Sequence, residues 1–121
     1  MARWISSSGV TAPVSIRLTA GAGLSAGDVT APVILLQGGT VTLTDLIQGS
    51  TSVTIDSAGA VTQQAGALIV TGLFTLNGGS ISLPEDNEIV ELNGLVATGP
   101  VFALNTVLPL LVSGAVTANG S

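Results

Sequence analysis

Acidic side chains are concentrated in one short segment of the sequence. This segment carries four carboxylates within seven residues, at Glu85, Asp86, Glu88 and Glu91. Ca²⁺ prefers hard oxygen ligands and takes about six to eight of them, which makes the segment a candidate calcium site. The spacing matches neither an EF-hand loop nor a nonapeptide calcium repeat, so the pattern favours a solvated acidic loop between Leu83 and Ile89. We therefore expect no bound metal and no other cofactor.

Side chains for acid–base or nucleophilic catalysis are scarce. The chain has no His, Cys or Tyr, and its two cations are Arg3 and Arg17. An activated serine would therefore lack an obvious base, and a carboxylate pair would need two acids converging from separate parts of the chain. We expect no catalytic residues and no enzymatic activity.

The overall charge excludes one further class of function. With a formal net charge of −5 and two cations, the chain cannot build the basic surface that follows a phosphate backbone, so we expect no nucleic-acid partner. No stretch approaches the roughly 20 apolar residues of a membrane-spanning helix, and we expect no membrane insertion. Residues 1–9 lack the apolar region of a secretion signal.

The elements that must position these residues repeat along the chain. The segment 69–80 returns, one glycine shorter, as 111–121, and the segment 37–44 returns as 77–84. The unit is about 40 residues long, and periods of about 20 to 50 residues are typical of solenoids, propellers and other arrays.

Short apolar runs between turn signals predict strands of four or five residues. In the run 40–44, Val41 and Leu43 fall on one face and three threonines on the other, and Ile81 and Leu83 repeat this pattern in the run 80–83. The other predicted strands cover 14–19, 33–36, 53–55, 67–71, 73–76, 89–92, 101–104 and 110–112.

Two all-β folds accommodate these strands. The favoured one is a parallel β-helix (β-solenoid) of about six coils, two coils to a unit, forming one domain over residues 1–121, because the repeated copies keep their apolar positions at the same spacing. The alternative is an antiparallel β-sandwich or barrel, since the Asn-Gly turns are also typical of hairpins.

Two runs, 33–36 and 110–112, are apolar at consecutive positions. Because successive side chains of a strand point to opposite faces, some of these side chains must point outward. Either neighbouring turns cover these side chains, or like chains associate over them. The candidate assembly faces are Val33, Ile34, Leu35, Leu36, Leu110, Leu111 and Val112.

Outward threonines raise the alternative of a flat ice-binding or glycan-binding face. The candidates are Thr42, Thr54, Thr62, Thr75 and Thr117. Beyond the run 40–44, however, no Thr-x-Thr pair recurs from coil to coil, and the strand propensity of threonine is the favoured explanation.

Three segments also resemble a known family. Residues 57–63, 94–99 and 108–120 are similar to the degenerate repeats of filamentous-haemagglutinin-like exoproteins, the large secreted bacterial adhesins of the two-partner secretion and autotransporter type, and the likeness extends over residues 29–121. The resemblance implies a right-handed parallel β-helix, export across the outer membrane, and service as a stalk or adhesive surface. The chain is shorter than those exoproteins, shows no recognisable secretion domain and begins with a methionine.

Two functional hypotheses follow. The first is a structural and adhesive β-solenoid, a segment or self-assembling subunit of an extracellular bacterial fibre at the cell surface. Its partners would be like chains, in a homo-oligomer or filament, and a host-surface or glycan receptor. The second is a phage or virus-like fibre or decoration subunit, located in the virion.

Overall fold

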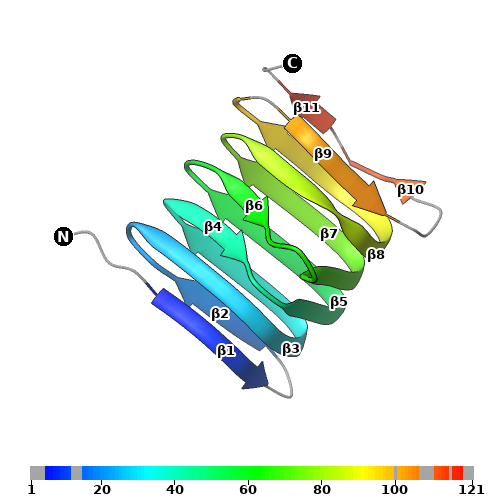
Figure 1. Cartoon of the computed structure of the whole chain (residues 1–121). Helices are drawn as coiled ribbons and strands as arrows, with labels where there is room; N and C mark the ends of the chain where they lie inside the picture. The colour runs from blue at the N-terminus through cyan, green and yellow to red at the C-terminus, as the bar shows by residue number, and fades with distance from the viewer. Residues whose placement is uncertain (1–4, 12–14, 100, 107–110, 115, 119–121) are drawn as a thin grey trace.

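The computed structural model describes residues 5–11, 15–99, 101–106, 111–114 and 116–118, with 5–11, 101–106 and 118 described by their backbone alone. These residues form strands and turns, and none of them is helical (Figure 1). The strands are β1 (Ile5–Thr11), β2 (Ser15–Thr19), β3 (Gly23–Gly38), β4 (Thr40–Leu43), β5 (Leu46–Ser57), β6 (Val61–Gln63), β7 (Leu68–Gly78), β8 (Ile81–Ala97), β9 (Val101–Thr106), β10 (Leu111–Val112) and β11 (Val116–Ala118).

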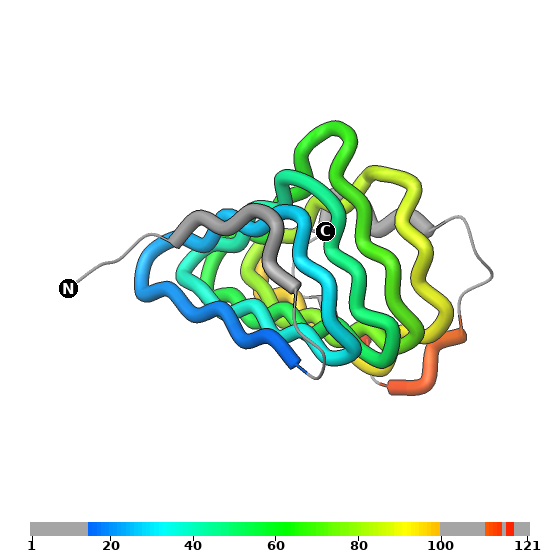
Figure 2. Tube along the Cα trace, turned by 90° about the horizontal axis from the view of Figure 1, so that it is seen from below, coloured from blue at the N-terminus to red at the C-terminus, as the bar shows by residue number. Residues whose placement is uncertain are grey.

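The strands pair in parallel throughout the described residues, and this confirms the predicted parallel β-helix over the antiparallel alternative. Val41 lies opposite Val61 and Val61 opposite Ile81, so one coil takes about 20 residues. The chain winds around a central axis with successive coils side by side (Figures 1 and 2). About five turns are formed, where the sequence predicts about six coils.

The register divides each coil into three segments that stack on their equivalents in the next coil. Stack 1 contains β4, β6, residues 24–26 of β3 and residues 81–82 of β8. Stack 2 contains residues 29–31 of β3, 47–49 of β5 and 69–71 of β7. Stack 3 contains β2, residues 33–37 of β3, 52–56 of β5 and 73–77 of β7. The long strands β3, β5 and β7 therefore bend from stack 2 into stack 3.

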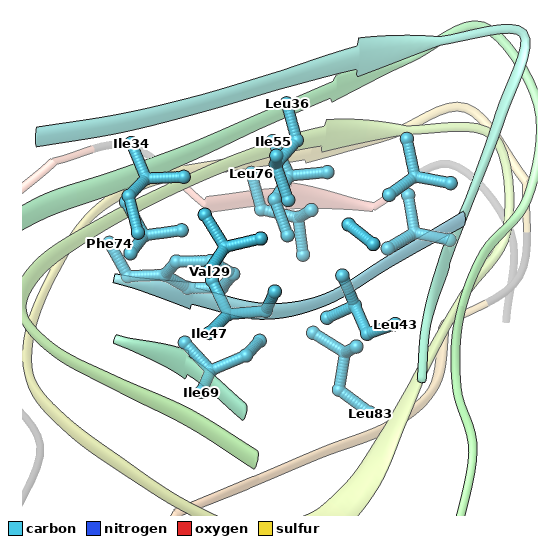
Figure 3. Close-up of a cluster of buried hydrophobic side chains, with 14 of the residues drawn as sticks. Val29, Ile34, Leu36, Leu43, Ile47, Ile55, Ile69, Phe74, Leu76 and Leu83 are labelled. Carbon is cyan, nitrogen blue, oxygen red and sulfur yellow. The ribbon is translucent and has the colours of Figure 1, made fainter. Parts of the chain in front are cut away.

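The core fills the inside of the coils, as the alternation of side chains predicts. In stack 3, Ile34, Val53 and Phe74 lie one above another and are fully buried, and Ile55 lies beside them (Figure 3). Burial of each such side chain contributes about 1.5–3 kcal/mol. Stacked apolar side chains inside a parallel ladder therefore hold the coils together.

A column of glycines forms the corner between stack 3 and the stack 1 segment of the following coil. The N–H of Gly59 donates to the carbonyl of Gly39 at 2.6 Å, that of Gly79 to Gly59 at 2.7 Å, and that of Gly99 to Gly79 at 2.6 Å. A Cβ on Gly59 would lie 2.7 Å from the carbonyl oxygen of Gly39, closer than real Cβ atoms come. The recurrence of glycine every 20 residues thus allows the coils to approach closely at this corner.

Candidate functional site

A groove of about 500 Å³ runs across several coils beside the glycine corner. Its floor consists of small residues, among them Gly38, Ala58 and Gly78. Ser57 lies below this surface and is buried, with its Oγ 3.2 Å from the carbonyl oxygen of Gly39 and accepting from the N–H of Gly59 at 3.2 Å. The groove is hollow because the residues at this corner have little or no side chain.

Three polar side chains of stack 3, those of Gln37, Asp56 and Asn77, form one wall of the groove. Thr19, Gln37, Asp56 and Asn77 occupy one outward column of four consecutive coils, because each lies opposite the next in the register. We call these four residues the polar ladder. Asp56 accepts a hydrogen bond from Asn77 Nδ2 at 3.2 Å through Oδ1 and from Gln37 Nε2 at 3.5 Å through Oδ2. Gln37 Oε1 in turn accepts from Arg17 at 3.2 Å and from Thr19 Oγ1 at 3.4 Å.

The ladder has hydrogen-bonding capacity left over. Each amide group has two N–H donors and an oxygen with two lone pairs, and each carboxylate oxygen accepts more than one hydrogen bond. Asn77 is exposed, and Gln37 and Asp56 are half-buried, so these groups face the groove rather than the core. The arrangement can bind polar groups of a ligand along the solenoid axis.

A second polar cluster lies inside the solenoid. Gln63 Nε2 donates to Asn87 Oδ1 at 2.6 Å, and Asn87 Nδ2 donates to Gln63 Oε1 at 3.3 Å. The same Asn87 oxygen accepts from the N–H of Ile69 at 2.9 Å, while Gln63 accepts from the N–H of Glu85 at 3.2 Å. Asn87 is fully buried and Gln63 nearly so, so the pair stabilises the fold and does not form a ligand site.

The acidic segment belongs to β8, and the prediction of a loop there is wrong. Its backbone is held in the strand by the Gln63–Asn87 pair, which bonds the N–H of Glu85 and the carbonyl of the same residue. The Glu85 carboxylate accepts from the N–H of Gly66 at 3.0 Å, Asp86 and Glu88 are exposed, and Glu91 lies further along in register with Leu73.

The four carboxylates consequently do not gather around one point. Within the described residues, no group of three acidic side chains lies close enough to hold a metal ion. The candidate calcium ligands Glu85, Asp86, Glu88 and Glu91 are spread along a strand because its side chains alternate in direction. Arg3, one of the two cations in the sequence, lies outside the described residues.

The predicted assembly faces divide into inward and outward positions. Ile34 and Leu36 are fully buried in the core, so including them in an assembly face was wrong. Val33 is exposed and Leu35 half-buried on the outside of stack 3, as the period of two requires. Leu110 lies outside the described residues.

The last described coil exposes apolar side chains for a different reason. Val112 lies opposite the buried Leu92 and Val116 opposite the buried Leu95, yet these two valines are 51% and 52% exposed. Leu111, beside them, is also exposed. Val112 and Val116 therefore continue the column of core residues, and no further coil of the described residues lies over them. Val116 was missed in the sequence because neither of its neighbours, Ala115 and Thr117, is a large apolar residue.

The candidate threonines do not share one face. Thr42 and Thr62 lie opposite each other in stack 1, with Oγ1 atoms 3.5 Å apart, and Ser25 and Ser82 extend this column. Thr54 and Thr75 are paired in stack 3, and Thr117 lies opposite Val96. The five candidate threonines are therefore divided between stack 1 and two separate columns of stack 3.

None of the described residues belongs to a helix long and apolar enough to cross a membrane. Comparisons with protein-family models, with curated proteins and with solved structures returned no match to this chain. What its residues and fold establish together is a parallel β-solenoid with a polar groove along one corner and core-type valines exposed on the last described coil.

Proposed function

We propose that this protein is a structural and adhesive β-solenoid, a self-assembling subunit of an extracellular bacterial fibre. Like chains join end to end, and the outward faces are displayed for attachment to a host surface. The likeness of its repeats to those of secreted bacterial adhesins supports the cell-surface location.

The exposed valines of the last described coil carry the proposal. Val112 and Val116 occupy positions that are filled by buried leucines one coil earlier, so a further coil laid over them would bury both side chains. Parallel strands at the edge of a sheet also present unpaired N–H and C=O groups, which another coil can bond. We propose that this further coil belongs to a second copy of the chain.

The composition supports a role based on surface rather than on chemistry. Charged residues make up 7% of the chain, against about 25% in ordinary soluble domains, so most of its surface is built from uncharged groups. Apart from Arg17 and Asp56, the outward positions of stacks 1 and 3 carry hydroxyl, amide and aliphatic groups.

Electron microscopy of the purified chain over a dilution series tests the proposal. We expect long filaments of uniform width, whose fibre diffraction shows the strand spacing of about 4.8 Å along the axis. Single particles at every concentration would overturn self-assembly. Closed oligomers of fixed size would also overturn it, and would favour the virion decoration subunit.

A matched pair of variants identifies the contact. Val112→Lys places a cation on the end coil and should abolish filaments. Val90→Lys is the control, because Val90 is 52% exposed and Val112 51%, but Val90 lies on the side of the solenoid within β8. Both changes reduce the net negative charge equally, so general repulsion cannot explain a difference. Filaments that survive Val112→Lys would place the contact elsewhere.

A further inference from the structure

We propose that the groove beside the polar ladder binds an uncharged oligosaccharide laid along the solenoid axis. The inference rests on the proposed adhesive function and names the ligand class and the binding site. Gln37, Asp56 and Asn77 carry it, together with the floor that they border.

The chemistry of the ladder fits hydroxyl groups. A hydroxyl donates one hydrogen bond and accepts up to two, and the polar ladder presents an acceptor-only carboxylate between two amides that both donate and accept. These groups recur once per coil, about 4.8 Å apart, over three successive coils. A chain with several hydroxyls on every unit can therefore bond to each coil in turn, whereas a small polar molecule would meet one coil only.

The floor of the groove argues against a peptide. An extended peptide binds to a sheet chiefly through unpaired N–H and C=O groups of the backbone. Here the N–H groups of Ala58, Gly59 and Gly79 are already bonded to carbonyls of the preceding coil. Recognition must therefore use side chains. The amide and carboxylate groups of the polar ladder suit a ligand that carries hydroxyl groups on its surface.

The charge of the site argues against an anionic chain. Asp56 lies at the centre of the wall, and the chain as a whole carries a net charge of −5. The one described cation, Arg17, lies two coils from Asp56 and already donates to Gln37. Sulfated or carboxylated polysaccharides would therefore be repelled, and an uncharged chain is favoured.

The shape of the groove sets the strength of binding. Its volume of about 500 Å³ falls in the usual range of ligand sites, about 300–1,000 Å³. Among the residues that the structure describes, no aromatic side chain lines it, so hydrogen bonds replace stacking and each site should bind weakly. Many copies along a fibre would raise the overall avidity without new contacts.

The test uses the full chain and NMR titration with three soluble probes, the hexasaccharides of β-1,4-glucose, β-1,4-mannose and α-1,4-glucose. We expect at least one to shift the side-chain amide signals of Gln37 and Asn77, and a heparin-derived hexasaccharide to leave them unchanged. No shift by any uncharged probe up to about 10 mM would overturn the proposal, since the binding free energy would then be weaker than about −3 kcal/mol. Preferential binding of the sulfated probe would overturn it too.

Three variants locate the site. Asp56→Ala should weaken binding by about tenfold or more, as expected for hydrogen bonds to a charged group. Ala58→Leu leaves the ladder intact but fills the groove, and should weaken binding as strongly. Thr54→Val is the control, because Thr54 points outward on the same strand and does not line the groove. If both Asp56→Ala and Ala58→Leu bound the saccharide as well as the unsubstituted groove does, the groove would not be the binding site.

The titration is performed in the Val112→Lys background, in which the proposed filaments are absent. Loss of saccharide binding there leaves the filament experiment unaffected, and absence of filaments in the wild-type chain leaves the titration unaffected. The two proposals therefore fail separately.

Discussion

Gln63 and Asn87 form a closed amide pair inside the solenoid, although 24 residues separate them in the sequence. The pair joins β6 to β8 and satisfies the N–H groups of Ile69 and Glu85. A polar pair this deep is stabilising only while each member keeps its partners.

Asn87→Ala should therefore lower the free energy of unfolding by about 3 kcal/mol, because it leaves the buried Ile69 N–H without its side-chain acceptor and removes one of the two acceptors of Gln63 Nε2, the other being the carbonyl of Ala67. Urea denaturation measures the change. Asn93→Ala is the control, since it removes only a solvent-exposed hydrogen bond on the same strand, from Asn93 Nδ2 to Thr75 Oγ1 at 3.3 Å, and should change stability by no more than about 0.5 kcal/mol. Equal effects of the two substitutions would refute a structural role for the pair.

Gly59→Ala should cost about 2 kcal/mol, because its Cβ would approach the carbonyl oxygen of Gly39 to 2.7 Å and push two coils apart. Gly72→Ala is the matched control, with the nearest atom at an ordinary 3.4 Å. Thermal unfolding followed by circular dichroism compares them. A melting temperature as high for Gly59→Ala as for Gly72→Ala would show that the corner has room for a side chain.

Asn77→Asp should destabilise the polar ladder more than Asn77→Ala does. The aspartate would replace a donor 3.2 Å from Asp56 by a like charge, whereas alanine removes only the hydrogen bond. The difference should be about 1 kcal/mol at low ionic strength and should shrink in about 1 M NaCl, where screening acts over about 3 Å. Melting temperatures of both variants at two salt concentrations provide the measurement, and a salt-independent difference would contradict this explanation.

Ile34→Ala and Val33→Ala test the alternation of neighbours in β3. Ile34 is fully buried and its truncation should cost about 2–5 kcal/mol, while Val33 points outward and should cost about 0.5 kcal/mol or less. Guanidinium denaturation curves of the two variants measure both values. The reverse order would mean that the register is displaced by one residue.

The β-solenoid fold could be predicted because its causes are local and repeated. The alternation of Val41 and Leu43 with threonines indicates which side of a strand is buried, and the return of the same pattern around Ile81 indicates stacked, equivalent strands. The same alternation explains why Val33 is exposed while Ile34 is buried, so the prediction that some side chains of this run face outward is confirmed.

The groove could not be predicted, because it depends on the exact length of each coil. Gln37 and Asp56 are 19 residues apart, and Asp56 and Asn77 are 21 apart, so no fixed period brings them into one column. Turns and register shifts absorb the difference, as between Gly49 and Ser52. Only the hydrogen-bonded register shows that the three side chains meet.

The sequence by itself favoured the parallel coil over the antiparallel alternative and indicated the inward strand positions, since both follow from short-range alternation or from a repeat. The tertiary structure decided which distant polar residues pair, namely Gln63 with Asn87 and the members of the polar ladder with one another. It also decided that the four acidic side chains are spread along β8. The physical reason is that these contacts join neighbouring coils, and one residue more or less in a turn changes which side chains lie opposite each other.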